Sequence, residues 1–393
     1  MKKRGVMLLC NTIMIAYAMS MTVASPLLSD IAASFSLSLS QSGFVFSSNF
    51  AGFVVFIFAG GVLADRMGKK KVLSFSLAGI SAALLLMPFS PNFYVVCVLL
   101  FLIGGFSGII ESIISAAVSD LNPQNPTFYV NLSQVFFGLG ALAGPIIAGF
   151  AAAGGATWRQ CYLALGIVFT LLSAIFLSDR TAYGNEREAA SAHAVKALLS
   201  DRNFLLICFC MFLYSGSEVG SWGWMATFLK EEAGFSVRAS AIAVGVFWAA
   251  IIAGRLVCGP LTYKLEERRV ILVLALFSAC AVFLSGWMSG AWMIWLVVAG
   301  MGVGYSSLWP LIVSYGGKMH RESSGTAFAM LVGSCGLGMM VIPYLLGIVG
   351  ELAGLRVAMM CPAILLAAIW LVFLFQRRPA EREDKVPFLG ENS

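Results

Sequence analysis

Charged residues are scarce in this sequence, and their scarcity excludes most soluble proteins. Only 11% of the 393 residues are Asp, Glu, Lys or Arg, whereas 60% are hydrophobic; a soluble domain carries about 25% charged residues. The mean hydropathy is +0.90. Apolar stretches of about 20 residues, the length of a helix that crosses a bilayer, recur along the chain. The sequence therefore predicts an all-α protein that lies in a lipid bilayer.

Histidine is almost absent, and cysteine occurs without a metal-binding pattern. His193 and His320 are the only histidines, and both fall in predicted loops. The nine cysteines lie within or beside apolar stretches, and the C-x-C of Cys208 and Cys210 has no second pair to complete a metal site. An intramembrane protease would need a Ser–His pair or two aspartates within the spans, and neither is found. We therefore expect no metal, no cofactor and no enzyme activity.

Twelve apolar spans can be delimited in the sequence. We expect them at residues 6–28, 43–64, 72–89, 93–118, 128–153, 158–178, 204–229, 239–263, 270–288, 291–316, 323–349 and 354–376. The longest charged interruption falls between the sixth and seventh spans. The sequence thus predicts an N-terminal six-helix bundle, a central linker, a C-terminal six-helix bundle and a tail, at residues 1–178, 179–203, 204–376 and 377–393.

Lysine and arginine are distributed unequally between the predicted loops. The loops on the side of the two chain ends hold 20 of these residues, and the other side holds Arg159, Lys230, Arg238 and Arg356. Because short cytoplasmic loops carry the excess of positive charge, we expect both termini in the cytoplasm and the protein in the cell (inner) membrane. The net charge of +6 then lies beside anionic lipids and requires no nucleic-acid partner.

The two halves share a short repeated pattern. GVLADRMGKKKVL begins at Gly61 after the second span, and GPLTYKLEERRVIL begins at Gly259 after the eighth. Two six-span repeats related by an axis along the membrane normal are an architecture of transporters, with the substrate site between the repeats near the bilayer midplane. We therefore expect two pseudo-symmetric six-helix halves around a central site.

Three ionisable residues lie well inside the predicted spans: Glu111, Glu218 and Arg255. An intramembrane ionisable residue is by default a functional candidate. The alternative is that each carboxyl group is structural, protonated and hydrogen-bonded between helices. Arg255 is either a gate or charge partner, or a side chain that extends to the membrane surface.

Polar and aromatic residues occur at helical spacing near these groups. Aromatic rings with hydroxyl, amide and carboxylate groups suit a small polyol, because rings pack on its C–H faces while polar groups bind its hydroxyls. An alternative for Trp222 is an interfacial tryptophan belt. Candidate substrate-binding residues that share helix faces are Tyr214, Glu218 and Trp222, then Asn131 and Gln134, and then Tyr305 and Trp309.

The segment GVLADRMGKKK has the form G-x-x-x-D-R-x-G-K-K-K and resembles the loop 2–3 signature of the major facilitator superfamily. The resemblance extends to the twelve spans and the charged central linker. It implies the major facilitator fold and a latch at the cytoplasmic gate, carried here by Gly61, Asp65, Arg66, Gly68 and Lys69. A loop whose lysines only set the topology would not need Asp65 with Gly61 and Gly68.

A narrower resemblance is to the fucose permease and glucose/mannose–proton symporter group. It is carried by GGFSGIIESIISAAVSDLNPQ, YVNLSQVFFGLGALAGP and FLYSGSEVGSWGWMATFL. It implies a coupling role for Glu111, and its span-five and span-seven patterns are carried here by Asn131, Gln134, Tyr214 and Glu218. As an intramembrane carboxyl group, Glu218 is a second coupling candidate. Thr22 stands where fucose permeases carry an aspartate, so a relay of that kind is not expected.

These patterns favour a secondary active transporter that imports a sugar or similar small polar solute by alternating access. We expect a coupling cation, a proton rather than a sodium ion, and function as a monomer. The alternative is an efflux antiporter for drugs or metabolites in the same superfamily, which the loop signature and the glycine–proline segment also fit.

Overall fold

The computed structural model describes residues 3–178, 197–261, 265–287, 290–320 and 323–376. Among them, twelve helical segments are long and apolar enough to cross a membrane. The twelve-span all-α prediction is therefore confirmed. Most of the expected linker and the whole expected tail, residues 179–196 and 377–393, lie outside the described part.

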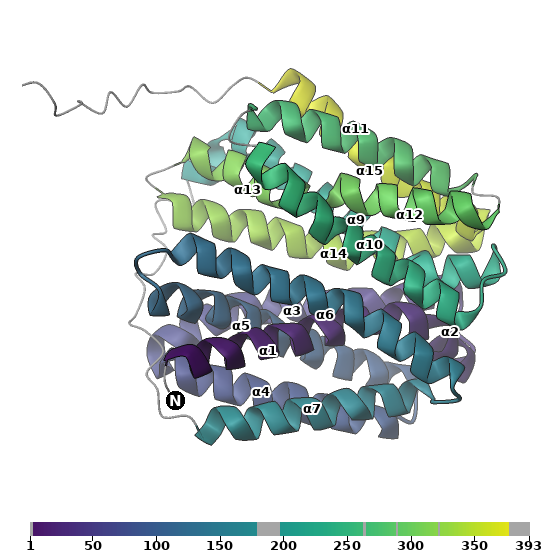
Figure 1. The fold of residues 1–393 in the computed structure, drawn as a ribbon, viewed down its shortest axis with the longest axis horizontal. Coiled ribbons are helices and arrows are strands. Elements are labelled where there is room, and N and C mark those ends of the chain that lie inside the picture. The colour runs from purple at the N-terminus through teal and green to yellow at the C-terminus, as the bar shows by residue number, and fades with distance from the viewer. Residues whose placement is uncertain (1–2, 179–196, 262–264, 288–289, 321–322, 377–393) are drawn as a thin grey trace, which may run out of the picture.

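The N-terminal half contains seven α-helices and one short 3₁₀ helix, η1 (Figure 1). They are α1 (Lys3–Thr22), α2 (Ala24–Phe35), α3 (Leu39–Met67), α4 (Lys69–Leu86), η1 (Met87–Phe89), α5 (Phe93–Leu121), α6 (Pro126–Ala153) and α7 (Trp158–Ser178). The C-terminal half contains α9 (Arg202–Glu231), α10 (Val237–Leu261), α11 (Glu267–Ser285), α12 (Ala291–Tyr305), α13 (Leu308–Met319), α14 (Ser324–Ala353) and α15 (Leu355–Phe375).

The first and tenth spans are each interrupted. The first is divided at Val23 into α1 and α2 and reaches Phe35, further than the expected end at residue 28. Pro26 lacks the N–H that would continue the helical hydrogen bonding to the preceding turn, which explains the break. The tenth is divided at Ser306 and Ser307 into α12 and α13. Pro310 lies four residues after Ser306 and likewise lacks the N–H that would bind the Ser306 oxygen in a continuous helix. Interrupted helices are typical of transporter binding sites, because they free backbone groups at membrane depth.

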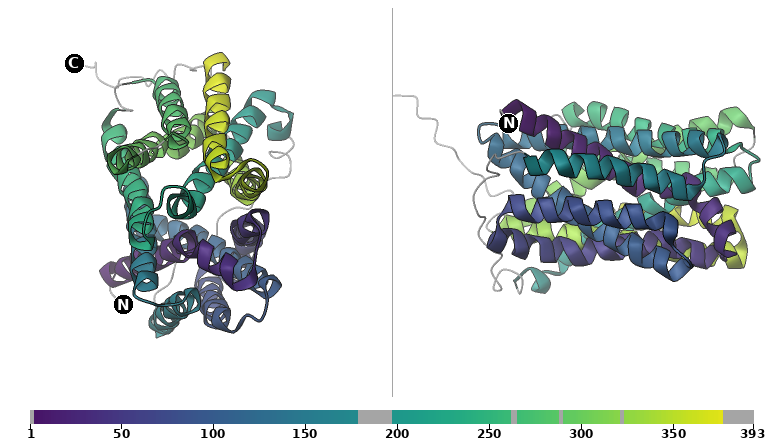
Figure 2. Two further views of the ribbon diagram at one scale, coloured as in Figure 1. Left: turned by 90° about the vertical axis from the view of Figure 1, so that its right-hand side faces the viewer. Right: turned by 90° about the horizontal axis from the view of Figure 1, so that it is seen from below.

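The two halves lie side by side as separate bundles (Figures 1 and 2). They meet where α3 packs on α14 and α6 packs on α10. Both ends of the described chain lie at one end of the bundle, on the left of Figure 1. We call this end the terminal face and the other end the opposite face.

The halves are joined near the opposite face. Ser25 Oγ donates to the backbone oxygen of Trp222 at 2.7 Å, and Glu351 Oε2 accepts from the backbone N–H of Ser40 at 3.1 Å. Lys230 Nζ lies 3.6 Å from Asp30 Oδ1. A further contact between the halves, from Ser47 Oγ to the backbone oxygen of Met340, also lies in the part of the interface nearer this face. The structure is therefore a state closed at the opposite face.

Candidate functional site

Glu111 is held by a tyrosine from another helix. Glu111 lies in α5 and is half-buried, and its Oε2 accepts a 2.7 Å hydrogen bond from the hydroxyl of Tyr17 in α1. Tyr17 is itself only 2% exposed. A buried carboxyl group needs such a partner, since leaving it without one costs several kcal/mol. The sequence indicated Glu111, but Tyr17 could be found only from the packing of α1 on α5.

Glu218 lies within a cluster of tyrosines in the other half. It is 7% exposed, just past the middle of α9, and lies beside Tyr214 one turn earlier. The Tyr214 hydroxyl donates to the backbone oxygen of Tyr305 at 3.3 Å, and the Tyr305 hydroxyl lies 3.0 Å from Ser221 Oγ. The structure therefore brings together Tyr214, Glu218 and Tyr305, as the helical spacing predicted for the first two.

A continuous run of aromatic rings connects the two carboxyl groups across the halves. Each ring centroid lies between 5.3 and 6.1 Å from the next one in the run. Rings at such separations attract one another edge to face as well as through buried area. From the Glu111 side to the Glu218 side, the rings are those of Tyr17, Phe137, Trp248, Phe247, Tyr305 and Tyr214.

Two tryptophans stand at the centre of this interface. Trp222 is 3% exposed and packs against Phe46 of the other half and against Trp248, so the alternative of an interfacial belt residue is wrong for it. Trp248 in α10 is 5% exposed, and its Nε1–H has no hydrogen-bond partner among the described residues. A buried donor without a partner is uncommon and suits a site that receives a ligand. Trp248 could not be identified from helical spacing, since its neighbours in this cluster belong to other helices.

Cys335 of α14 lies in the neighbourhood of both carboxyl groups. It is 4% exposed and lies within electrostatic range of both Glu111 and Glu218. Its thiol also interacts with the side chain of Trp309 in α13. The sequence spacing predicted that Tyr305 and Trp309 share one helix face. This prediction is wrong, because the break at Ser306 and Ser307 places them on separate helices.

Asn131 and Gln134 lie on α6, the helix that contributes Phe137 to the aromatic run. Asn131 is exposed and Gln134 is half-buried, and neither hydrogen-bonds to another described residue. Gly138, on the same helix face, would place a Cβ 3.0 Å from Ile252 of α10, so this face is directed toward the other half. Their contact with a substrate remains a prediction.

Arg255 of α10 lies within a candidate membrane span. Its Nε donates to the backbone oxygen of Ser306 at 2.9 Å, at the break between α12 and α13. It is half-buried and within electrostatic range of Glu218 and Tyr214. The intramembrane cation of the sequence therefore belongs to the Glu218 cluster.

The loop 2–3 signature lies at the terminal face. Gly68 joins α3 to α4 with φ of +84°, a conformation that glycine adopts readily and other residues rarely do. Lys69 forms an ion pair with Asp120 near the end of α5. Arg66 is exposed, and the surroundings of Gly61 and Asp65 lie outside what the structure describes. Asp120, which the sequence did not single out, therefore ties the loop to a neighbouring helix.

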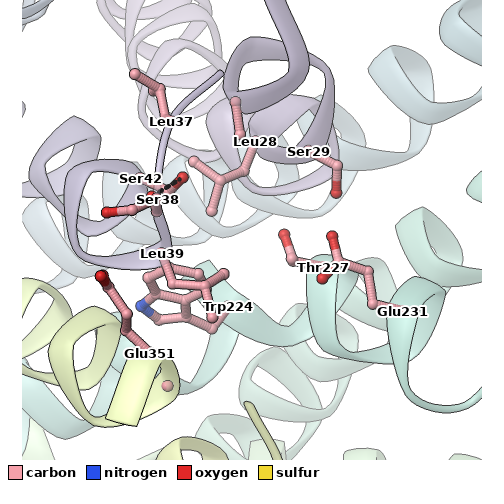
Figure 3. A pocket seen from close by; sticks show the side chains of 12 residues that line it. Leu28, Ser29, Leu37, Ser38, Leu39, Ser42, Trp224, Thr227, Glu231 and Glu351 are labelled. Atoms are coloured by element: carbon pink, nitrogen blue, oxygen red, sulfur yellow. Dashed lines mark hydrogen bonds between the residues drawn. The ribbon is translucent and has the colours of Figure 1, made fainter. Parts of the chain in front are cut away.

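A separate cavity of about 420 Å³ opens at the opposite face (Figure 3). It lies between the two halves, and its lining includes Ser38, Trp224, Thr227, Glu231 and Glu351. Three of its lining residues belong to α9, the helix that also carries Glu218. None of the predicted site residues lines it. We therefore call this cavity the vestibule and distinguish it from the Glu218 cluster.

Comparison with known proteins agrees with this architecture. The family model described as Major Facilitator Superfamily matches residues 10–331. The probable sulfoacetate transporter SauU of Cupriavidus necator is 27% identical and covers 89% of this chain and 87% of its own length. A glucose/galactose transporter of Brucella abortus is 24% identical and covers 85% of both chains.

The solved structure of the fucose:proton symporter FucP of E. coli has the same fold. It superposes with a TM-score of 0.64 at 18% identity, covering 96% of this chain and 100% of that chain. The predicted resemblance to the superfamily and to its sugar transporters is thus confirmed. The chain belongs to the Major Facilitator Superfamily and is a multi-pass membrane transporter rather than an enzyme.

Proposed function

We propose that this protein imports a sugar or a similar small polar solute, driven by a proton gradient. In this proposal the terminal face lies in the cytoplasm, and the described state is open toward that side. The solute binds between the halves, at the aromatic run and the Glu218 cluster, and the protein works by alternating access as a monomer.

One observation carries the proposal: two intramembrane carboxyl groups, Glu111 and Glu218, lie one in each half and are connected through aromatic side chains. The rings offer flat apolar faces to the C–H groups of a sugar, while Glu218, Ser221 and the Nε1–H of Trp248, which has no partner among the described residues, offer polar contacts to its hydroxyls. The transporters of glucose and galactose and of sulfoacetate among the relatives are consistent with a small polar solute.

The coupling step is assigned to Glu111. Among the described residues, its carboxyl group hydrogen-bonds to Tyr17 alone, whose hydroxyl can donate to the ionised form. A change between the inward-open and outward-open states changes the access of water to this group and hence its affinity for a proton. Proton binding and solute binding then favour the same conformational change, which is how a symporter couples them.

Uptake into proteoliposomes tests the proposal. Radiolabelled glucose and galactose should accumulate when a proton gradient is imposed and should not accumulate with an equal sodium gradient. Equilibration without accumulation under both gradients would contradict proton coupling. Accumulation only against the imposed proton gradient would instead indicate an antiporter and favour the efflux alternative.

A further inference from the structure

Arg255 has hydrogen-bond donors that no described residue of the protein accepts from. The residue shares one face of α10 with Trp248 and Ile251, at spacings of three and four residues, and so points toward the aromatic run. Its Nε is bound to the Ser306 oxygen, which fixes the plane of the guanidinium group. Its two terminal nitrogens have no hydrogen-bond acceptor among the described residues.

The charge of Arg255 is also without a direct counter-ion. No carboxylate of a described residue lies within 4.0 Å of it, although Glu218 is within electrostatic range. An arginine stays protonated under all ordinary conditions. A cation at membrane depth is costly, and it persists where it faces a polar cavity or binds something. The site therefore has an excess of positive charge whenever Glu218 carries a proton.

We propose that Arg255 binds an acidic group of the transported solute, a carboxylate or sulfonate, through its two terminal nitrogens. This inference rests on the proposed function and narrows its substrate class to small organic anions with hydroxyl groups. Planar guanidinium groups bind such groups with two parallel hydrogen bonds. The hydroxyl-bearing part of the solute then reaches the rings of Tyr214, Tyr305 and Trp248.

The arrangement also suggests how the proton and the solute cooperate. When Glu218 is ionised, its negative charge lies near Arg255 and competes with an incoming anion. Protonation of Glu218 removes that competition. A proton bound at Glu218 thus raises the affinity of the site for an anion, and the anion in turn raises the affinity for the proton.

A purely structural role for Arg255 makes a different prediction. Binding the Ser306 oxygen stabilises the end of α12 and needs only Nε. Loss of such a brace would affect neutral and acidic solutes equally, because it disturbs the whole site. The two roles are therefore separable by comparing solutes that differ only in one acidic group.

The experiment is calorimetric binding of glucose and of glucuronate to the purified full-length protein. We expect the wild-type protein to bind glucuronate at least about 10-fold more tightly than glucose, in line with charge-assisted pairing. Arg255→Gln should weaken glucuronate binding by about 10- to 100-fold and change glucose binding by less than about 3-fold. Arg255→Lys, which keeps the charge but not the planar fork, should fall between them.

Arg268→Gln is a matched control. Arg268 also donates from Nε to a backbone oxygen, that of Phe373 at 2.8 Å, but it lies near the terminal face of the same half. The Arg268→Gln variant should bind glucose and glucuronate as tightly as the wild-type protein does. The melting temperature of each variant shows whether it is folded. If Arg255→Gln does not fold, Arg255→Lys still tests the inference.

Two results would overturn the inference. If the wild-type protein binds glucose as tightly as glucuronate, or if Arg255→Gln weakens both equally, Arg255 does not recognise an acidic group, while import of a neutral sugar stands. If neither compound binds, both this inference and the proposed solute class are overturned.

Discussion

The hydroxyl of Tyr17 and the carboxyl group of Glu111 lie 2.7 Å apart, although 94 positions separate them in the chain. The contact fixes α1 against α5 at the place where a proton would be carried. Because the hydroxyl can donate to an ionised carboxylate or to the carbonyl oxygen of a neutral carboxyl group, it accommodates both states of Glu111.

Replacing Glu111 should separate coupling from transport. Glu111→Gln keeps an oxygen that accepts from Tyr17 but cannot bind and release a proton. We expect gradient-driven accumulation in proteoliposomes to be abolished, while exchange of labelled for unlabelled solute remains within about 3-fold of the wild type.

Tyr17→Phe is the comparison for that variant. It leaves the titratable carboxyl group and removes only its donor, so accumulation should be reduced but measurable. If Glu111→Gln accumulates solute as the wild type does, Glu111 does not couple.

Replacing Glu218 should weaken binding of a neutral sugar. A carboxylate that accepts hydrogen bonds contributes ~1.5–3 kcal/mol for each, so Glu218→Gln should lower the affinity for glucose by about 10- to 100-fold and Glu218→Ala further. Titration of the purified variants with glucose measures this.

Glu231→Gln provides a control carboxylate, since Glu231 lines the cavity at the opposite face, at the far end of the helix that carries Glu218. Its affinity for the solute should equal that of the wild type. Unchanged affinity in both Glu218 variants would leave Glu218 as a structural or coupling group.

The loop 2–3 residues should act on turnover rather than on binding. Asp120→Asn breaks the ion pair with Lys69, which holds the start of α4 to the end of α5. We expect it, and Asp65→Asn, to slow uptake while equilibrium affinity stays within a few-fold. A loss of affinity of about 100-fold, or ~2.7 kcal/mol, with normal turnover would place this loop at the binding site instead.

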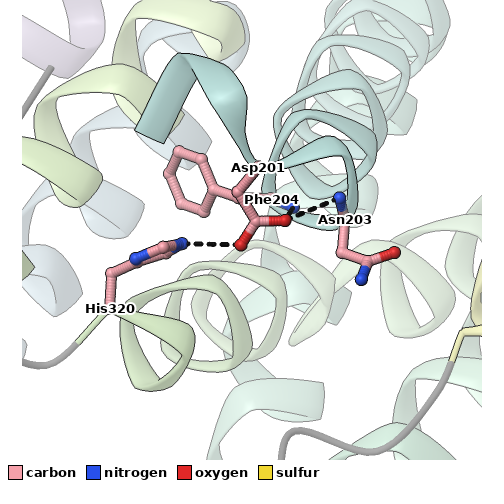
Figure 4. Close-up of polar contacts among 4 residues, drawn as sticks. All are labelled: Asp201, Asn203, Phe204 and His320. Carbon is pink, nitrogen blue, oxygen red and sulfur yellow. Dashed lines mark hydrogen bonds and ion pairs between the residues drawn. The ribbon is translucent and has the colours of Figure 1, made fainter. Parts of the chain in front are cut away.

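Asp201 should make stability depend on pH at the terminal face (Figure 4). Partial burial opposes its ionisation, but hydrogen bonds from the backbone of Phe204, from His320 and from the backbone of Asn203 outweigh this and hold its pKa below the ordinary value. It caps the N-terminus of α9, and His320 Nε2 lies 2.9 Å from its Oδ2. A depressed pKa contributes stability that is complete above the unfolded value, near ~3.9, and is lost as the pH falls through the folded value.

Asp201→Ala should therefore lower the unfolding free energy at neutral pH by about 0.5–2 kcal/mol, the usual value of an N-cap. Thermal melting of the detergent-solubilised protein at several pH values measures it. The difference from the wild type should shrink below about pH 4, because the carboxylate is then being protonated. A difference that is constant down to pH 2 would show that the charge of Asp201 does not matter.

Close glycine contacts should hold the opposite face shut. A Cβ on Gly347 of α14 would lie 2.6 Å from the backbone oxygen of Leu39 in the other half. Gly347→Val should therefore force the halves apart there and shift the population toward a state open at the opposite face. A cysteine introduced at Ser42 in the vestibule should then react faster with a membrane-impermeant maleimide.

Gly317→Val is the matched control, because a Cβ at Gly317 of α13 would have no neighbour within 4 Å. In the Gly317→Val background, the cysteine at position 42 should react with the maleimide as fast as it does in the wild-type background. An equal rate in the Gly347 variant would show that this contact does not limit opening.

Much of the architecture follows from the sequence alone. The number of spans depends on the length of apolar stretches, and each stretch can be read independently of the others. Glu111, Glu218 and Arg255 stand out for the same reason, because a charged residue within an apolar span is conspicuous wherever its neighbours lie. The grouping of Tyr214 with Glu218 also follows, since both are on one turn of one continuous helix.

Only the tertiary structure decided which groups from different helices meet. Tyr17 beside Glu111, Asp120 beside Lys69 and Trp248 at the centre of the aromatic run leave no periodic signal, because each contact depends on how two helices pack. Pro310 favours a break near Ser306, but only the structure shows that this break separates Tyr305 from Trp309 and that the Ser306 oxygen binds Arg255. Helical periodicity fixes which residues share a face, but the packing of that face against another helix is a property of the whole bundle.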